Sequence, residues 1–251
     1  MKLLTTKIFA HRGASMHAPE NTMPAFQLAY EHGADGIETD VQLTKDNIPV
    51  LIHDEQVKRT TNGSGFVKDL TLHELKQLDL GAWFSPDYRG TTILSLEEFL
   101  QWIEPKSLYL NIELKNTKIN YKNLESIVHG MLSRYQLLDR TTLSTFNPVS
   151  IRRLREHYHD LDIAFLTSRR NRKLVRNTRI LGANALHVKY RLLRPSLVDA
   201  CRQTNMELRV YTVNRAVQMH RCFTLRTDGI ITDVPDLAVQ QRKIYQSEQT
   251  N

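Results

Sequence analysis

Three acidic residues stand where they can act together. Glu38 and Asp40 lie two residues apart in a β-like run, so their side chains point to the same face. Glu113 lies in another such run and can join them from a neighbouring strand. Three converging carboxylates repel one another unless a cation lies among them, and an oxygen-only set without sulfur favours Mg²⁺ or Ca²⁺ over zinc. Neutralisation by arginine and lysine side chains alone is the alternative.

Two histidines are candidates for proton transfer. His11 and His53 each follow a β-like run, and histidine gives and takes protons near neutral pH. The chain has ten histidines, so a surface or packing role is the alternative for either one. Arg12 and Lys115 stand beside these residues and suit an anionic oxygen. Together with three carboxylates and one divalent ion they leave a formal charge of +1, which a phosphodiester neutralises.

Eight β-like runs alternate with helical stretches, which is the pattern of an α/β protein with a parallel sheet. The predicted strands are residues 7–13, 36–42, 108–115, 141–146, 162–167, 185–190, 207–214 and 229–233. The predicted helices are residues 24–32, with Asn21 or Thr22 as N-cap, 121–135, 148–157, 171–181, 195–204 and 216–225, with a last one after Pro235. This number of units in 251 residues predicts a TIM (β/α)8 barrel, in which chemistry takes place at the carboxyl ends of the strands.

A ninth β-like run at residues 49–53 follows the strand at 36–42 too closely for a parallel return, which needs about a dozen residues. We therefore expect it to pair antiparallel. The segment at about 54–105 is too long for a plain βα loop and predicts a subdomain inserted after the second strand. Its aromatic residues either pack locally or line a channel: Phe66, Trp83, Phe84 and Tyr88. No linker divides the chain, so residues 1–251 are expected to form a single domain.

The composition is that of a globular protein and excludes disordered and fibrous classes. The net charge is +7, and residues 152–179 carry nine basic and three acidic side chains, so nearly all of the excess lies there. Arg169–Arg179 is therefore a candidate for weak contact with an anionic surface, with a solvated helix face as the alternative. Few aromatic residues accompany these cations, so we predict no nucleic-acid partner.

Two cysteines, Cys201 and Cys222, are too few for a disulfide framework and lack metal-site spacing, which fits a reducing compartment. The chain starts like a secretory signal, but Thr5, Thr6 and Lys7 interrupt the apolar run. No stretch approaches the roughly 18 consecutive apolar residues of a membrane span. We expect a cytoplasmic protein, and the sequence leaves its oligomeric state undetermined.

The chain has no GxSxG, HExxH, GxxxxGK[ST] or strand-linked GxGxxG motif, so competing catalytic classes are disfavoured. Instead it resembles the glycerophosphodiester phosphodiesterases over nearly its whole length. The matching motifs, in the family's order, are HRGA at 11–14, PENT at 19–22, GADGIETDV at 33–41, TKD at 44–46, HD at 53–54, RTTNG at 59–63, IELK at 112–115, YTVN at 211–214 and GIITD at 229–233. Each motif is weak evidence by itself, whereas their common order is specific.

The resemblance implies metal-dependent hydrolysis of small glycerophosphodiesters to glycerol 3-phosphate and an alcohol. The implied roles are acid–base catalysis by His11 and His53, binding of one divalent cation (Mg²⁺ or Ca²⁺) by Glu38, Asp40 and Glu113, and phosphate contact by Arg12 and Lys115. A related phosphodiesterase acting on lysophospholipid or inositol phospholipid, and a non-catalytic phosphoester-binding barrel, are the alternatives.

Two further residues are candidates for substrate contact. Tyr211 stands where most members of the family carry tryptophan, and its hydroxyl group is able to bond to substrate. His187 falls near the end of its predicted strand, where it either faces substrate or packs.

Overall fold

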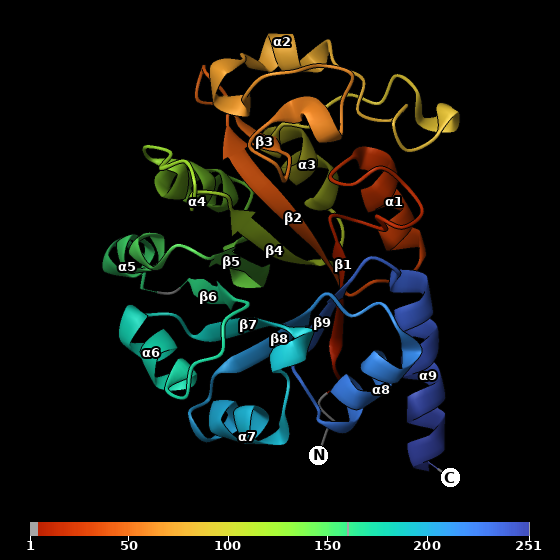
Figure 1. The fold of residues 1–251 in the computed structure, drawn as a ribbon, viewed down its shortest axis with the longest axis vertical. Coiled ribbons are helices and arrows are strands. Elements are labelled where there is room, and N and C mark those ends of the chain that lie inside the picture. The colour runs from red at the N-terminus through yellow and green to blue at the C-terminus, as the bar shows by residue number, and fades with distance from the viewer. Residues whose placement is uncertain (1–4, 160, 251) are drawn as a thin grey trace.

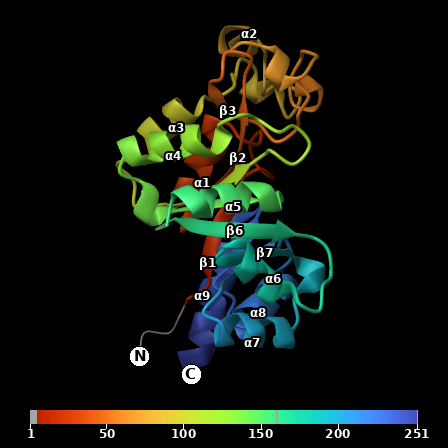
Figure 2. The same ribbon diagram turned by 90° about the vertical axis from the view of Figure 1, so that its left-hand side faces the viewer.

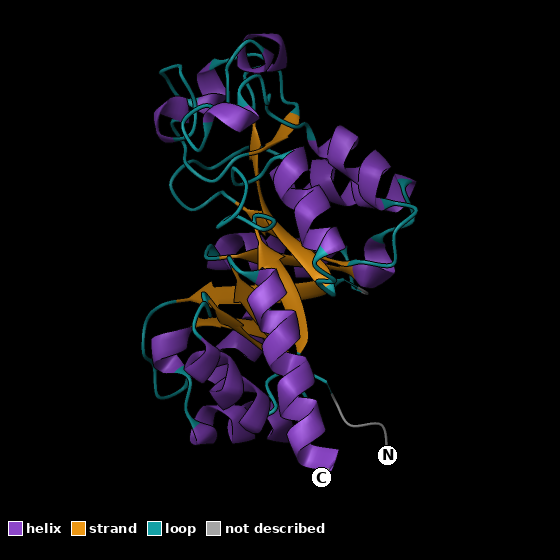
Figure 3. Ribbon diagram, turned by 90° about the vertical axis from the view of Figure 1, so that its right-hand side faces the viewer, coloured by secondary structure: helices purple, strands orange, loops and turns teal. Residues whose placement is uncertain are grey.

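A computed structural model describes residues 5–159 and 161–250 of the chain, and a closed parallel sheet forms its centre (Figures 1 and 3). The barrel strands are β1 (Lys7–His11), β2 (Gly36–Leu43), β4 (Tyr109–Leu114), β5 (Thr141–Thr145), β6 (Asp162–Thr167), β7 (Ala185–Lys189), β8 (Glu207–Tyr211) and β9 (Gly229–Thr232). Each pairs with the next along the chain, and β9 pairs with β1 to close the barrel. The prediction of a TIM (β/α)8 barrel is confirmed.

One helix follows each barrel strand and covers its outer side (Figure 3). These helices are α1 (Met23–Glu31), α3 (Leu96–Ile103), α4 (Leu124–Arg134), α5 (Pro148–His157), α6 (Leu174–Leu181), α7 (Pro195–Gln203), α8 (Ala216–Thr224) and α9 (Pro235–Thr250). Several ends follow from local chemistry. Ser95 and Glu98 form a capping box at the start of α3, Asn147 caps α5, and Gly182 in the left-handed region ends α6.

The short strand β3 (Pro49–Leu51) pairs antiparallel with β2, with Leu51 opposite Val41. The antiparallel return predicted from the spacing is thus confirmed. Because β3 begins beside Leu43 at the end of β2 and runs back along that strand, it returns the chain to the level of Asp40 and brings His53 beside the acidic residues of β2. The return therefore brings a residue from outside the barrel strands to the site.

Side chains along each barrel strand point alternately outward and inward, which separates an apolar outer layer from a polar interior. On β2, Ile37 and Val41 belong to the core between sheet and helices, whereas Glu38 and Asp40 face the barrel interior. Phe26 of α1 and Phe99 of α3 pack in this core with ring centroids 4.7 Å apart. The helices therefore hold the barrel from outside, and charged side chains occupy its inside.

The segment after β3 contains α2 (Leu72–Lys76) and three short 3₁₀ helices, and lies at the opposite end of the molecule from α6, α7 and α8 (Figures 1 and 2). It has a small core of its own, made of Val50, Ile52, Val57, Val67, Leu75, Leu80 and Ile93. Helix α3 lies within the range expected for the insertion, but its apolar side packs in the main core. The separately packed part therefore ends near Ile93. No helix among the described residues is long and apolar enough to cross a membrane.

Candidate active site

Three carboxylates meet at the carboxyl end of the barrel. Glu38 and Asp40 come from β2, and Glu113 comes from the adjacent β4, where it lies opposite Asp40 in the register. One oxygen from each carboxylate lies within 4.8 Å of the others, and all three residues are buried. The structure thus brings together the three acidic residues that the sequence singled out.

Two cations neutralise part of this charge. Arg12 Nε lies 3.2 Å from Asp40 Oδ2, and Lys115 Nζ lies 2.9 Å from Glu113 Oε1 and 3.6 Å from Asp40 Oδ1. Both side chains are mostly buried, so these ion pairs are weakly screened. Three carboxylates against two cations leave one excess negative charge in the cluster.

The pKa shifts in this cluster show that its negative charge is not fully neutralised by Arg12 and Lys115. Burial and the neighbouring Asp40 charge raise the pKa of Glu38. Burial also raises the pKa of Glu113, against the lowering effect of Lys115. Arg12 and Lys115 outweigh burial at Asp40 and hold its pKa below the usual range.

The donor set fits a hard divalent cation. Asp40 Oδ1 is buried and has no hydrogen-bond partner among the described residues, which leaves a ligand atom available within the oxygen cluster. Carboxylate oxygens are the ligands that Mg²⁺ and Ca²⁺ prefer, and a divalent ion here would reverse the excess negative charge.

His11 is held by an acidic partner at the end of β9. Its Nδ1 donates to Asp233 Oδ1 at 2.6 Å, and its Nε2 lies 3.9 Å from Glu38 Oε2. Burial lowers the pKa of His11, but the charge of Glu38 and the bond to Asp233 outweigh it and raise the pKa. Asp233 is in turn held by Ser15 and Asn214, so the orientation of the imidazole ring is fixed by a hydrogen-bonded network.

His53 repeats this arrangement on the other side of the site. Its Nδ1 donates to Asp54 Oδ1 at 2.6 Å, and Arg59 Nε donates to Asp54 Oδ2 at 2.6 Å. Burial raises the pKa of Asp54, but the bonds from Arg59 and His53 prevail and lower it to about 2. In both pairs an aspartate occupies Nδ1, so Nε2 is the ring nitrogen that the aspartate leaves free.

A tight turn after β1 positions Arg12. Arg12 and Gly13 both have positive φ angles, 55° and 85°, and a Cβ at Gly13 would lie 2.6 Å from the backbone of Ala25 in α1. This turn points the Arg12 N–H at Glu38, whose Oε2 accepts at 3.0 Å. The HRG motif is therefore needed for backbone geometry as well as for its side chains.

A cleft of about 540 Å³ opens beside the carboxylates. It is lined by His53, Glu113 and Lys115 on one side and by residues of the β5 and β6 ends on the other, including Phe146 and Arg169. The cleft gives a ligand access from solvent to the carboxylate cluster. Its far wall combines an aromatic ring with a cation.

Tyr211 and His187 lie inside the barrel at different levels. Tyr211 is the last residue of β8, its ring meets that of Phe146 edge-on at 6.3 Å, and its hydroxyl group has no partner in the described structure. His187 lies opposite Arg209 in the register, two residues deeper than the level of Tyr211, and is fully buried. Both ring nitrogens of His187 lack partners within the described residues. The structure thus places Tyr211 near the site and His187 beneath it.

Three residues hold the site together although the sequence predicted no role in the site for them: Glu20, Asn21 and Arg59. Asn21 donates to Asp40 Oδ2 at 3.0 Å, and Glu20 joins Arg12 to Arg59 by bonds of 2.7 to 2.8 Å. Of the two residues predicted as N-cap of the first helix, Thr22 occupies that position, without a side-chain cap bond, whereas Asn21 bonds to the site. The PENT motif at residues 19–22 is the sequence signal for these residues, because a run of polar residues that follows HRGA so closely is placed to contact the site.

The aromatic residues of the inserted segment pack mainly on one another. Phe84 meets Trp83 and Tyr88 edge-on, with ring centroids 5.7 Å apart in each pair. The Tyr88 hydroxyl group donates to the backbone oxygen of His17 at 3.0 Å, which ties the segment to the loop after β1. None of the three rings lines the catalytic cleft.

Comparison with known proteins agrees with this geometry. Residues 11–237 match the model of the glycerophosphoryl diester phosphodiesterase family. A glycerophosphodiester phosphodiesterase of Caldanaerobacter subterraneus subsp. tengcongensis is 40% identical over 94% of this chain and 97% of its own length. One of Bacillus altitudinis is 39% identical over 95% and 98%.

Solved structures give the same result. A phosphodiesterase of Oleispira antarctica, solved in complex with the product sn-glycerol-3-phosphate, superposes with a TM-score of 0.90 at 26% identity, covering 95% of this chain and 97% of that one. A glycerophosphodiester phosphodiesterase of Agrobacterium tumefaciens gives 0.82 at 28% identity, covering 94% and 99%. The resemblance seen in the motifs is confirmed: the chain belongs to the glycerophosphoryl diester phosphodiesterase family.

Proposed function

We propose that this protein hydrolyses glycerophosphodiesters to glycerol 3-phosphate and an alcohol, using one divalent cation and a pair of histidines. The observation that carries the proposal is the meeting of three buried carboxylates with two His–Asp pairs at one end of the barrel. The Oleispira antarctica relative binds sn-glycerol-3-phosphate, which supports a small phosphoester as ligand.

Glu38, Asp40 and Glu113 would hold the cation, Mg²⁺ or Ca²⁺. When bound, the cation supplies Lewis-acid polarisation of a phosphoryl oxygen. Arg12 and Lys115 then face the same anionic group, because their ion pairs to the carboxylates already hold them at the cluster. Fixed cations of this kind stabilise charge that develops on the phosphoryl oxygens in the transition state.

His11 and His53 would share the proton transfers. One Nε2 removes the proton from water, or from the neighbouring glycerol hydroxyl group, as its oxygen bonds to phosphorus. With the glycerol hydroxyl as nucleophile the first product is a cyclic glycerol phosphate, which water then opens to glycerol 3-phosphate with the two histidines in exchanged roles. The other Nε2 donates a proton to the alcohol oxygen as the old P–O bond breaks, so that neither an alkoxide nor a hydroxide ion is released. Asp233 and Asp54 hold the rings in place for this exchange.

Tyr211 would contact the bound diester from the barrel side. Its unpartnered hydroxyl group is available to a substrate oxygen, and burial raises its pKa, so it stays a neutral donor. Because His187 lies a level deeper and is fully enclosed, we assign it no contact with substrate.

The test is release of glycerol 3-phosphate from glycerophosphocholine by enzyme stripped of metal and then supplied with Mg²⁺ or Ca²⁺. We expect metal-dependent release that is lost in His11→Ala and in Glu113→Gln. His73→Ala is the matched control, since His73 is exposed in α2. Release that persists in the metal-stripped enzyme would contradict the metal role, and full activity of His11→Ala would contradict the role of that histidine.

A further inference from the structure

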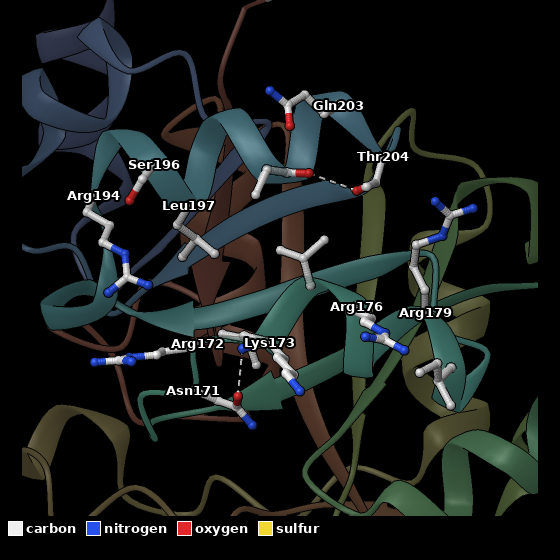
Figure 4. A pocket seen from close by; sticks show the side chains of 14 residues that line it. Asn171, Arg172, Lys173, Arg176, Arg179, Arg194, Ser196, Leu197, Gln203 and Thr204 are labelled. Atoms are coloured by element: carbon white, nitrogen blue, oxygen red, sulfur yellow. Dashed lines mark hydrogen bonds between the residues drawn. The ribbon is translucent and has the colours of Figure 1, made fainter.

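A second cavity lies outside the catalytic site, between α6 and α7, and its lining is positively charged (Figure 4). It is a groove of about 680 Å³ with an apolar floor that includes Leu174, Val175 and Leu197. Five basic residues line it and no acidic residue does: Arg172, Lys173, Arg176, Arg179 and Arg194. In Figure 4, Arg194 extends from the start of α7 toward the start of α6.

These five cations have no counter-charges among the residues that the structure describes. The side chains of these five residues make no ion pair or hydrogen bond to another described residue, and Lys173 bonds to Asn171 only through its backbone N–H. By contrast, Arg12, Arg59 and Arg242 each contact a carboxylate at close range. Like charges gathered without partners repel one another and favour binding of an anion.

The arrangement of the cations follows a line. Arg176 and Arg179 are three residues apart in α6, a rise of about 4.5 Å, and Arg172 and Lys173 extend the row before the helix begins. Arg194 faces this row from α7. A row of cations in a groove matches a flexible chain with repeated negative charges better than it matches a single small anion.

The row also leads to the catalytic cleft. Arg169 lines that cleft, and it lies three positions before Arg172 of the groove, a span of at most about 11 Å. A chain lying in the groove can therefore continue over Arg169 to the carboxylate cluster. This continuity connects the groove to the site of hydrolysis.

We propose that the α6–α7 groove binds the repeated phosphates of a linear phosphodiester polymer, and holds that chain while its end occupies the catalytic cleft. The part concerning the chain end rests on the proposed function. A flat bilayer cannot enter a concave groove. The lining has no aromatic ring on which nucleic-acid bases would stack, so a polymer of phosphodiester-linked polyol units fits better than DNA or RNA.

Binding is measured without turnover, by fluorescence anisotropy of end-labelled linear polyphosphate in EDTA. The variant R172Q/R176Q/R179Q removes three of the four cations in the row, and K122Q/R226Q/K243Q removes the same charge from exposed sites elsewhere. We expect the groove variant to lose on the order of ten-fold or more in affinity at low salt, and the control to change little. The slope of log K against log salt should fall by about two in the groove variant, because each lost phosphate contact on a flexible chain removes about 0.7.

Two further measurements identify the kind of ligand that the groove binds. Poly(glycerol phosphate) should compete with labelled polyphosphate, and long oligomers should compete better than short ones in the wild type but not in the groove variant. R172K/R176K/R179K should retain most of the affinity, and melting temperatures of all variants check their folding.

The proposal is overturned if the groove variant binds polyphosphate as the wild type does. It is also overturned if the row of cations is needed only for phosphatidylglycerol vesicles or for single-stranded DNA. A wild type that binds polyphosphate through the groove but hydrolyses no glycerophosphodiester contradicts the proposed function alone, because binding is measured separately from hydrolysis.

Discussion

The barrel interior has two layers that treat charge in opposite ways. In the layer at the carboxyl end, the Glu38–Asp40–Glu113 cluster has an unpartnered carboxylate oxygen on Asp40 and a raised pKa at Glu38. In the deeper layer, Arg209 donates to Glu207 at 2.9 Å and to Thr142 at 3.0 Å, and lies over the Phe9 ring at 4.2 Å. The deeper cation is fully paired within the protein, whereas Arg12 and Lys115 neutralise the upper cluster only in part.

This difference indicates where the protein binds and where it is stabilised. A buried charge without a partner lowers the stability of the fold. Such a charge is retained where a bound ligand supplies the missing partner. A satisfied one contributes to the fold and leaves nothing for a ligand to bind. The upper layer should therefore tolerate loss of charge without unfolding, and the deeper layer should not.

The largest effect is expected in the upper layer. Glu113→Gln removes one carboxylate that would hold the cation, so glycerophosphodiester hydrolysis should fall about a thousandfold, since both the cation and Lys115 lose a partner. The melting temperature should stay the same or rise, because a repulsive charge is removed. Steady-state kinetics and calorimetry measure both, with the exposed Glu248→Gln as control. A marked drop in melting temperature would show that the upper layer is also structural.

The deeper layer should give the opposite result. Arg209→Leu leaves Glu207, Asn111 and Thr142 without their donor, so the free energy of unfolding should fall by about 3 kcal/mol. Urea denaturation measures this loss, and Arg209→Lys should recover part of it. Activity per folded molecule should change little. If Arg209→Leu is as stable as the wild type, the contrast between the layers fails.

A smaller effect on turnover is expected from the residue that orients His11. Asp233→Asn keeps the size of the side chain but removes its charge, so kcat should fall about a hundredfold while KM changes little. Asp236→Asn, which alters an exposed contact with His17 at 3.3 Å, is the control. An equal loss in both variants would mean that Asp233 has no special role.

The smallest effect concerns His187 and pH. Burial, followed by the charge of Arg209, lowers its pKa well below the unfolded value of 6.5. Below about pH 6.5 the unfolded chain therefore binds a proton that the folded chain resists, and the free energy of unfolding falls as the pH is lowered toward the folded pKa. His187→Gln should lose less stability than the wild type between pH 7 and pH 5, as thermal melting at each pH can show. His73→Gln, at an exposed site, should follow the wild type.

Much of the site was predictable because strand geometry is regular. The two-residue spacing of Glu38 and Asp40 places both on one face of any strand, and parallel neighbours place Glu113 beside them. The short connection before residue 49 excluded a parallel return, so the run had to pair antiparallel and return His53 toward the strand that carries Glu38 and Asp40. These inferences needed only local periodicity and connection length.

Other contacts depend on residues far apart in the chain. Glu20 and Arg59 are 39 residues apart, and His11 and Asp233 are 222 apart, so no local pattern joins them. The basic segment around α6 was visible in the sequence, but its position opposite Arg194 in one groove was not. Closure of the barrel and packing of adjacent helices bring these residues together.

The sequence by itself therefore determined the strand and helix pattern, the barrel class and the set of residues able to do chemistry, because each depends on residue type and short-range spacing. Only the tertiary structure decided which of these side chains have partners. Among the described residues it left Asp40 Oδ1 without a hydrogen bond and the α6–α7 cations without counter-charges, while satisfying Arg209. The physical reason is that pairing depends on distances of a few ångströms between distant segments, which closure of the barrel sets.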